Sequence, residues 1–300
     1  MAFGSVLLLT ASGAQAQLGR EIEIPLGTAV QAAGVATDAA VLPTEAGFAV
    51  SQLQNERVLD ARVETRFQIK RLFHEKGIRY PAAEVFLRIF KRERTLELWV
   101  RPDGDESFTM LKQYPVCALA GELGPKRMQG DAQVPEGFYA IDFFNPVSDY
   151  HLSLHLDYPN QRDRLSSAAA TDLGGEIFIH GGCNSEGCLA LTDDGIKELY
   201  WVAVEARAVG QHSIPVHIFP ARLEDEDLRN LQNVFSERPE LGAFWQSLKP
   251  GYDFFEQNRR MPAVTVDASG NYLVNGVGAA PVGPLGKPLG APVAGGAGNE

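Results

Sequence analysis

Residues 177–190 read IFIHGGCNSEGCLA, and this stretch decides how the chain around it is expected to fold. Its first residues, 177–179, are aromatic or β-branched, which is typical of a strand. A glycine-rich loop follows, with His180 at its start and Cys183 and Cys188 within it. Helical spacing of apolar residues begins after the loop, so the stretch joins a strand to a helix.

The helix after the loop is predicted from residues that favour a helix start. Thr192 can cap the first turn, and Asp193 and Asp194 suit the partial positive charge at that end. The apolar face of this helix is then expected at Ile196, Leu199, Tyr200 and Ala203.

Upstream of the loop, the sequence predicts one long helix followed by short strands. A charged, proline-free run from Gly47 to Gly77 has apolar residues at helical spacing and predicts a single helix that ends at Gly77. Alternating apolar residues predict a hairpin over 84–100. Further strands are expected at 108–117, 137–144, 151–157, 176–180 and 215–219. Short strands broken by Gly, Pro and Asp indicate a mainly β core, sandwich-like, with flanking helices (α+β).

Downstream of the loop, two helices and one more hairpin are expected. The helices are predicted at 224–235 and 241–258, and the hairpin AVTVDASGNYLV at 263–274 turns at Ser269 to Asn271. The chain beyond is Gly, Pro, Ala and Val with almost no charge, a composition that buries too little surface to fold. We therefore expect a disordered tail at 276–300.

The N-terminal residues predict export. Residues 1–16 combine a short apolar stretch with Ala14-Gln15-Ala16, a small-x-small cleavage site typical of a signal peptide, so a periplasmic or envelope location is expected. No Lys or Arg precedes the apolar stretch, which points to a natural start upstream of Met1. The alternative is an apolar N-terminus on a cytosolic protein. Residues 17–46, rich in Ala, Gly, Thr and Pro, are predicted to be a leader or linker.

The composition limits the class of protein. A chain of 300 residues, 45% hydrophobic and 22% charged, is long enough to bury a substantial core. The net charge of −11 argues against a nucleic-acid-binding surface. After the N-terminal stretch, no apolar run approaches the roughly 20 residues of a membrane-spanning helix, so no integral membrane domain is expected. Three cysteines leave at least one thiol unpaired within the chain.

Three kinds of chemistry could use the residues of the loop, and the first two are structural. His180, Cys183 and Cys188 could bind zinc, but structural zinc needs four ligands and the only further cysteine is Cys117. No metal or other cofactor is therefore predicted. Alternatively, a disulfide between Cys183 and Cys188, or between Cys117 and Cys183, could staple the loop of an exported protein.

The third kind of chemistry is nucleophilic catalysis, in which a thiol attacks a carbonyl after an imidazole removes its proton. Gly187, immediately before Cys188, permits a tight turn that would aim the N–H groups of both residues at a developing oxyanion. His180 lies at the end of an apolar strand, which would hold an imidazole base rigidly. A position shortly before a helix would also stabilise a Cys188 thiolate.

Two segments carry a resemblance to a known family. His180-Gly181, followed by Ser-x-Gly-Cys at 185–188, resembles the motif of the L,D-transpeptidase catalytic domain, the YkuD-type fold. The segment GPKRMQGDAQVPEGFYAI at 124–141 is similar to the region before the catalytic strand in the same family. Its GPK, QGD and PEG motifs most resemble the branch of YafK-type murein L,D-transpeptidases. The resemblance covers about residues 84–220.

The chain also differs from the common motif of that family, Ser-His-Gly-Cys followed by Ile-Arg. Glu186 stands in the place of the second histidine and Ala190 in the place of the arginine. The YafK-type branch is similar in lacking both. Substrate handling is therefore expected to differ from that of the main cross-linking enzymes.

The resemblance implies a cysteine acyltransferase that acts on peptidoglycan stem peptides. Cys188 would attack the diaminopimelate carbonyl to form a thioester, with His180 as general base and acid and the Gly187 N–H as an oxyanion donor. An amine acceptor, including one on a wall-attached protein, would resolve the thioester. Resolution by water would instead make the chain a hydrolase that releases wall-linked peptides or proteins. The remaining alternative is a catalytically dead wall-binding module with a Cys183–Cys188 disulfide.

The resemblance also suggests a domain division and a set of substrate contacts. The implied domains are an N-terminal helix at 47–80, a catalytic domain at 81–220 and C-terminal helices with a hairpin at 221–275. Stem peptides carry carboxylates, so cations should line the groove. The candidate substrate-binding residues are Lys126, Arg127, Asp131, Tyr139, Tyr158, Gly181 and Ser185, with Arg162 and Arg164 behind them.

Two residues of the loop are expected to act indirectly. Ser185 is expected to brace the loop through a hydrogen bond from its hydroxyl to the backbone. Cys183 is an extra thiol near the proposed nucleophile, and as a resolving or disulfide partner of Cys188 it could gate activity by oxidation.

Overall fold

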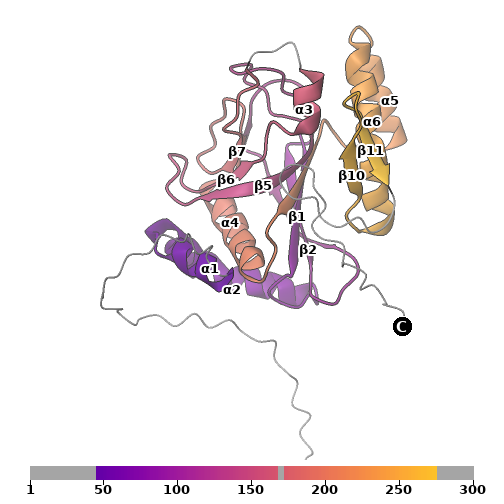
Figure 1. The fold of residues 1–300 in the computed structure, drawn as a ribbon. Coiled ribbons are helices and arrows are strands. Elements are labelled where there is room, and N and C mark those ends of the chain that lie inside the picture. Colours follow the sequence, from indigo (N-terminus) through magenta and orange to yellow (C-terminus); the bar gives the residue numbers. More distant parts are fainter. Residues whose placement is uncertain (1–44, 168–171, 276–300) are drawn as a thin grey trace, which may run out of the picture. The chain divides into compact units, whose positions relative to one another are not determined.

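The computed structural model describes residues 45–167 and 172–275 (Figure 1). The predicted signal peptide, residues 17–44 of the predicted linker and the predicted tail at 276–300 lie outside these ranges. The described residues contain six helices: α1 (Glu45–Leu53), α2 (Glu56–Glu75), α3 (Gln161–Ser166), α4 (Asp193–Ala208), α5 (Asp225–Val234) and α6 (Pro239–Asn258). Their strands are β1 (Glu84–Phe90), β2 (Thr95–Arg101), β3 (Thr109–Pro115), β4 (Ala118–Leu119), β5 (Gly137–Asn145), β6 (Ser153–Leu156), β7 (Phe178–His180), β8 (Leu189–Ala190), β9 (Ile214–Phe219), β10 (Ala263–Val266) and β11 (Tyr272–Asn275).

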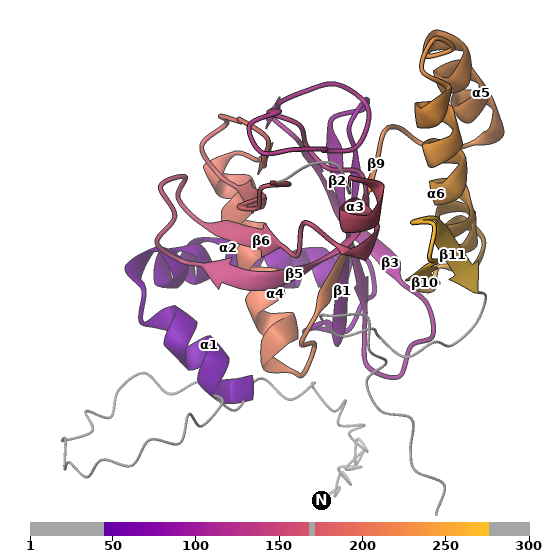
Figure 2. The ribbon, with the colours of Figure 1, turned by 45° about the horizontal axis from the view of Figure 1, so that its top comes forward.

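The fold class is α+β, as predicted, and most strands belong to one sheet. Nine strands are hydrogen-bonded in the order β3-β2-β1-β9-β5-β6-β7-β8-β4, and β10 pairs with β11 separately. The pairs β1–β9 and β7–β8 are parallel, whereas the others are antiparallel. β5 and β6 lie across the direction of β1 and β2 (Figures 1 and 2). The sandwich-like core is therefore one continuous, curled sheet.

Helix α4 has the apolar face that the sequence predicted. Ile196, Leu199, Tyr200 and Ala203 are fully buried. The helix packs against α1 and α2 and contacts β1, β6 and β7. Thr192 caps it, because its Oγ1 accepts a hydrogen bond from the Gly195 N–H at 3.1 Å. The start of α4 is thus held firmly just beyond the loop that contains Cys188.

The predicted single helix over 47–77 is wrong in one respect, because the chain forms two helices there. Asn55 has an extended backbone conformation, and its side chain accepts a hydrogen bond from the Arg57 N–H at 3.0 Å. Asparagine favours an N-cap over a helix interior, so it ends α1 and starts α2. The short elements α3, β4 and β8 were not predicted, whereas every predicted strand and both C-terminal helices are present.

The C-terminal elements cover the sheet through an aromatic cluster. Phe90 and Phe219, from neighbouring strands, pack with Trp245, Leu248 and Tyr252 of α6, and all five are buried. Figure 2 shows α5, α6 and the β10–β11 hairpin grouped together. In the described residues no helix combines the length and the apolar character needed to cross a bilayer.

Candidate active site

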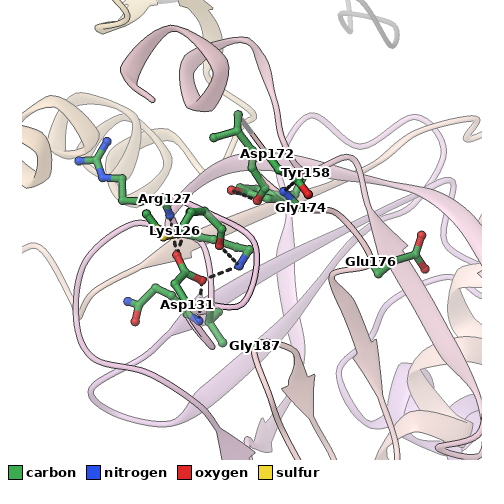
Figure 3. A network of polar contacts seen from close by, with 12 residues as sticks. Lys126, Arg127, Asp131, Tyr158, Asp172, Gly174, Glu176 and Gly187 are labelled. Carbon is green, nitrogen blue, oxygen red and sulfur yellow. Dashed lines mark hydrogen bonds and ion pairs between the residues drawn. The ribbon is translucent and has the colours of Figure 1, made fainter. Parts of the chain in front are cut away.

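The segment 124–137 forms a loop organised by one carboxylate, that of Asp131. It accepts backbone hydrogen bonds from Arg127 at 2.8 Å, Met128 at 3.1 Å and Gln133 at 3.1 Å, and Lys126 Nζ lies 2.5 Å from Oδ1 (Figure 3). Partial burial alone would raise the pKa of Asp131, but these donors outweigh it and hold the pKa below its ordinary value. The GPK and QGD motifs are therefore parts of one folded unit.

The two ends of this loop are fixed to the protein interior by a buried ion pair. Lys91 Nζ lies 3.0 Å from Glu136 Oε1, and both side chains are fully buried. Lys91 also donates to the carbonyls of Gly124 and Val134, each at 2.9 Å. Glu136 accepts from the Gly124 N–H at 2.7 Å and from Trp245 Nε1 at 2.8 Å. The Lys91 ammonium and the Glu136 carboxylate are therefore both hydrogen-bonded as well as paired, which offsets the cost of burying their charges.

His180 ends β7 with an imidazole that is only 2% exposed. Its Nδ1 lies 2.5 Å from the Gly181 carbonyl oxygen. A carbonyl can only accept, so Nδ1 carries the proton and the neutral ring keeps Nε2 as an acceptor. The Tyr150 ring lies 4.6 Å from the imidazole, and burial lowers the pKa of His180. The Gly181 carbonyl therefore orients the imidazole.

Glycine is required at both positions after His180, for a different physical reason at each. A Cβ at Gly181 would lie 2.6 Å from Asp193 Oδ1 and 3.0 Å from the Tyr150 carbonyl oxygen, so there is no room for a side chain. Gly182 has φ +82°, and its N–H donates to Asp193 Oδ1 at 2.9 Å. The start of α4 therefore fixes the turn that follows the imidazole.

Cys188 is the free cysteine of the described residues and is partly buried. In the parallel β7–β8 pair, Ile179 is the register partner of Leu189 and His180 that of Ala190. Cys188 immediately precedes β8, and its sulfur lies against Phe178, two residues before His180 on β7. The thiol contacts the Phe178 N–H at 3.4 Å and the Glu176 carbonyl oxygen at 3.5 Å.

The electrostatic surroundings keep Cys188 protonated at rest. Burial raises the pKa of the thiol, and the charge of Glu176 acts in the same direction. The Phe178 N–H and the Lys126 ammonium oppose this shift but do not outweigh it. Both the Cys188 thiol and the His180 imidazole are therefore neutral at neutral pH.

The other two cysteines form a disulfide, Cys117–Cys183, with a Cα–Cα distance of 5.4 Å. The alternative Cys183–Cys188 disulfide, and with it the dead module built on that bond, is wrong. The proposed oxidation partnership between Cys183 and Cys188 is wrong for the same reason. A zinc site at His180, Cys183 and Cys188 is also excluded, because the Cys183 sulfur is already bonded. Across residues 45–167 and 172–275, no group of three or more His, Cys, Asp or Glu is arranged to hold a metal ion.

Ser185 braces the loop as expected. Its hydroxyl donates to the Cys188 carbonyl oxygen at 2.7 Å and accepts from the N–H groups of Ala120 at 3.2 Å and Gly187 at 3.3 Å. Gly187 has φ +129°, and Ala132 and Gln133 of the Asp131 loop lie against it. The Asp131 loop thus backs the turn that precedes Cys188, as Figure 3 shows for Gly187.

Comparisons with known proteins give the family. The family model described as the L,D-transpeptidase catalytic domain matches residues 85–218. Over 194 residues the chain is 39% identical to "Putative L,D-transpeptidase YafK" of Escherichia coli strain K12, a match that covers 64% of this chain and 74% of that protein. This chain belongs to the L,D-transpeptidase catalytic domain family. The protein of the same name from Escherichia coli O157:H7 matches to the same extent.

Solved structures resemble this L,D-transpeptidase chain more distantly. The helical cell shape determining protein Pgp2 from Campylobacter jejuni is 20% identical with a TM-score of 0.38, and the match covers 57% of this chain and 58% of that one. Bdellovibrio bacteriovorus Bd1075 is also 20% identical, with a TM-score of 0.34 and coverage of 59% and 62%.

Several of the candidate substrate-binding residues lie inside the protein. Tyr139 is 4% exposed, and its hydroxyl contacts Asp163 at 3.1 Å. Tyr158 is also 4% exposed and donates to the Leu173 carbonyl oxygen. Gly181 is packed against α4, as described above. The prediction that these residues contact substrate is therefore corrected: Tyr139 and Tyr158 support the core, and Gly181 positions His180.

The cations predicted to line the groove differ in their burial and in their partners. Lys126 is buried and paired with Asp131, so it acts on the thiol through its field more than as an open carboxylate ligand. Arg162 is buried, with its guanidinium 3.8 Å from the Phe244 ring, whereas Arg164 is exposed on α3. The guanidinium of Arg127 has no hydrogen-bond or ion-pair partner among the described residues. Arg127 is half-buried, and its charge interacts with those of Arg162, Asp163 and Glu240.

Several residues that shape the site were not predicted from the sequence. Lys91 and Glu136 were not singled out, although the PEG motif contains Glu136. Tyr150, whose ring lies 4.6 Å from the His180 imidazole, is on the connection between β5 and β6, where no sequence pattern indicated a role in the site. Phe178 was treated only as a strand residue, yet its N–H contacts the Cys188 sulfur.

Proposed function

We propose that this chain is a peptidoglycan L,D-transpeptidase in which Cys188 forms a thioester with the diaminopimelate carbonyl of a stem peptide. The observation that carries the proposal is a free thiol that contacts Phe178, two residues along β7 from an imidazole whose proton is fixed at Nδ1. Membership of the L,D-transpeptidase family supports the substrate class. Such an enzyme would work in the periplasm or cell envelope.

The first step requires transfer of the thiol proton to His180 Nε2. The thiol's contact with the Glu176 carbonyl oxygen is 3.5 Å long, so little is lost when the sulfur turns towards the imidazole. The resulting thiolate attacks the carbonyl, and His180 then delivers its proton to the leaving amine. The Lys126 charge favours the thiolate during this step.

The oxyanion formed in this step would be stabilised by the backbone of the glycine turn. The Gly187 N–H is 3.3 Å from the Ser185 hydroxyl, a long hydrogen bond that a developing oxyanion can replace. Together with the Cys188 N–H, this group forms the proposed oxyanion hole. An acceptor amine, from a second stem peptide or a wall-attached protein, resolves the thioester and regenerates the thiol.

The test is product analysis on purified muropeptides, with and without an added amine acceptor. We expect a new amide-linked product only when the acceptor is present, with loss of the original leaving amine. Release of shortened or detached peptides at equal rates with and without acceptor would instead identify a hydrolase of the same thioester route. The absence of any product from the reduced and the oxidised protein would rule out both enzymes in favour of a binding module.

His180 provides a prediction with a defined pH dependence. Because burial lowers the pKa of His180, the base stays neutral, and acylation should persist, down to below the ordinary histidine value of about 6.5. In His180→Gln, the rate at neutral pH should fall about 10²-fold to 10⁴-fold and should rise only as the thiol itself ionises at alkaline pH. Stopped-flow acylation by a chromogenic β-lactam from pH 5 to 10 measures this. If the acylation rate of the variant fell at acidic pH as it does in the wild type, His180 would not be the group that accepts the thiol proton.

A further inference from the structure

A second imidazole–carboxylate pair lies on the sheet beside this site. His155 of β6 and Asp142 of β5 are joined by a 2.6 Å contact between Nδ1 and Oδ1. A carboxylate can only accept when ionised, so Nδ1 carries a proton, and Nε2 is the atom that accepts a proton when the ring is neutral. The His155 side chain is 19% exposed, so part of the ring reaches solvent. The mechanism described above makes no use of this pair.

Phe178 links His155 to the proposed nucleophile. His155 is the register partner of Phe178, and the Phe178 N–H contacts the Cys188 sulfur at 3.4 Å. Neighbouring strands lie about 4.8 Å apart, so the backbones of His155 and Cys188 are separated by about 10 Å across the Phe178 position. The His155 and Phe178 rings are in contact, with centroids 4.8 Å apart. A thioester on Cys188 and the His155 side chain can therefore meet above Phe178.

A charge that acts on both groups supports this placement. Glu176, just before β7, raises the pKa of His155 and also that of Cys188, so its carboxylate acts on both sites. The other charged groups that act on His155 are Asp142, whose hydrogen bond is the largest cause of its raised pKa, and Asp157. All three are acidic. Their field attracts an ammonium group, the form in which an amine acceptor arrives at neutral pH.

We propose that His155, oriented by Asp142, is a further catalytic residue that accepts the proton of the amine resolving the Cys188 thioester. This inference rests on the proposed function and names the part of the site that binds the acceptor. His180 then serves formation of the thioester and His155 its resolution. The acceptor class is a primary amine, approaching Cys188 from the β6 side of the sheet.

An acceptor in its ammonium form first loses one proton to solvent. The nitrogen of the neutral amine attacks the thioester carbonyl, a C–N bond forms, and a second N–H proton passes to His155 Nε2. The C–S bond then breaks with its electron pair on sulfur, which leaves an amide and the Cys188 thiolate. The proton on His155 returns through solvent to the thiolate, so the free enzyme is restored.

The test compares formation and resolution of the acyl-enzyme in His155→Gln, with His74→Gln on the exposed end of α2 as the matched control. We expect His155→Gln to form the acyl-enzyme at the wild-type rate but to resolve it with amine about 10²-fold more slowly, at the lower end of general-base effects. Intact mass spectrometry would show the thioester accumulating during turnover. Asp142→Asn, which keeps the side-chain shape, should show a smaller loss of the same kind, and both should lose the pH dependence of resolution that His155 provides.

Each other outcome overturns the inference in a recognisable way. Equal resolution rates in wild type and His155→Gln would show that His155 is not the base. A slower acylation with a raised KM and an unchanged resolution rate would make His155 a substrate anchor, and a rate loss with unchanged pH dependence would make it structural. If the wild type itself never forms an acyl-enzyme, the proposed function fails, and this inference fails with it.

Discussion

Cys188→Ala should abolish acyl transfer, lowering the rate of muropeptide turnover by at least about 10³-fold. The variant keeps the fold, because the Cys188 side chain makes only two weak polar contacts, at 3.4 and 3.5 Å. It removes the atom that would bond to the substrate carbonyl, and no neighbouring thiol replaces it, since Cys117 and Cys183 are bonded to each other. Incubation with a carbapenem, which acylates nucleophilic thiols, should add one adduct to the wild type and none to the variant.

The control for this prediction is the double variant Cys117→Ala/Cys183→Ala. It should keep the adduct and most of the activity at low temperature, because neither sulfur reaches the substrate carbonyl. Loss of a crosslink over 66 residues should nevertheless lower the free energy of unfolding by about 4 kcal/mol on the chain-entropy model. If the double variant lost the adduct as completely as Cys188→Ala, in conditions where it remained folded, the assignment of the nucleophile would be wrong.

The local features of the site could be predicted because each depends on residues close in sequence. The strand before His180, the glycine turn and the cap at Thr192 follow from patterns within 177–203. The free Cys188 did not follow, because three cysteines allow several pairings and only the fold shows that Cys117 is near Cys183. The β4–β8 pairing brings them together, and its two-residue strands are too short to give a signal.

The errors concerning Tyr139 and Tyr158 have a different cause. Resemblance places both residues near the site in sequence, but it does not tell which side of a strand faces the ligand. In β5 the residues Gly137, Tyr139 and Ile141 are buried in alternation, so Tyr139 points into the core. The burial alternation of the strand was thus a better guide to that residue than its nearness to a motif.

Glu136→Ala should be the most destabilising single substitution among the residues that support the site. It would leave the Lys91 ammonium buried without its counter-charge and would remove the acceptor of Trp245 Nε1 and of the Gly124 N–H. Breaking a buried ion pair by removing one partner costs about 3 to 5 kcal/mol. Urea unfolding monitored by tryptophan fluorescence measures the difference. Burial already lowers the pKa of Lys91, so part of the loss should be recovered at alkaline pH, where the unpaired amine becomes neutral.

The matched control is Asp227→Asn, which removes the partner of Arg92 in an ion pair at the surface. Its two side chains are 40% and 29% exposed, so water screens their attraction and the expected loss is at most about 1 kcal/mol. If Glu136→Ala were no more destabilising than Asp227→Asn, water must reach Lys91 and the loop could not be held by a buried pair. If the prediction is correct, the loop that backs Gly187 owes its position to two charges 45 residues apart in the chain, and activity should fall in Glu136→Ala even at temperatures where the protein stays folded.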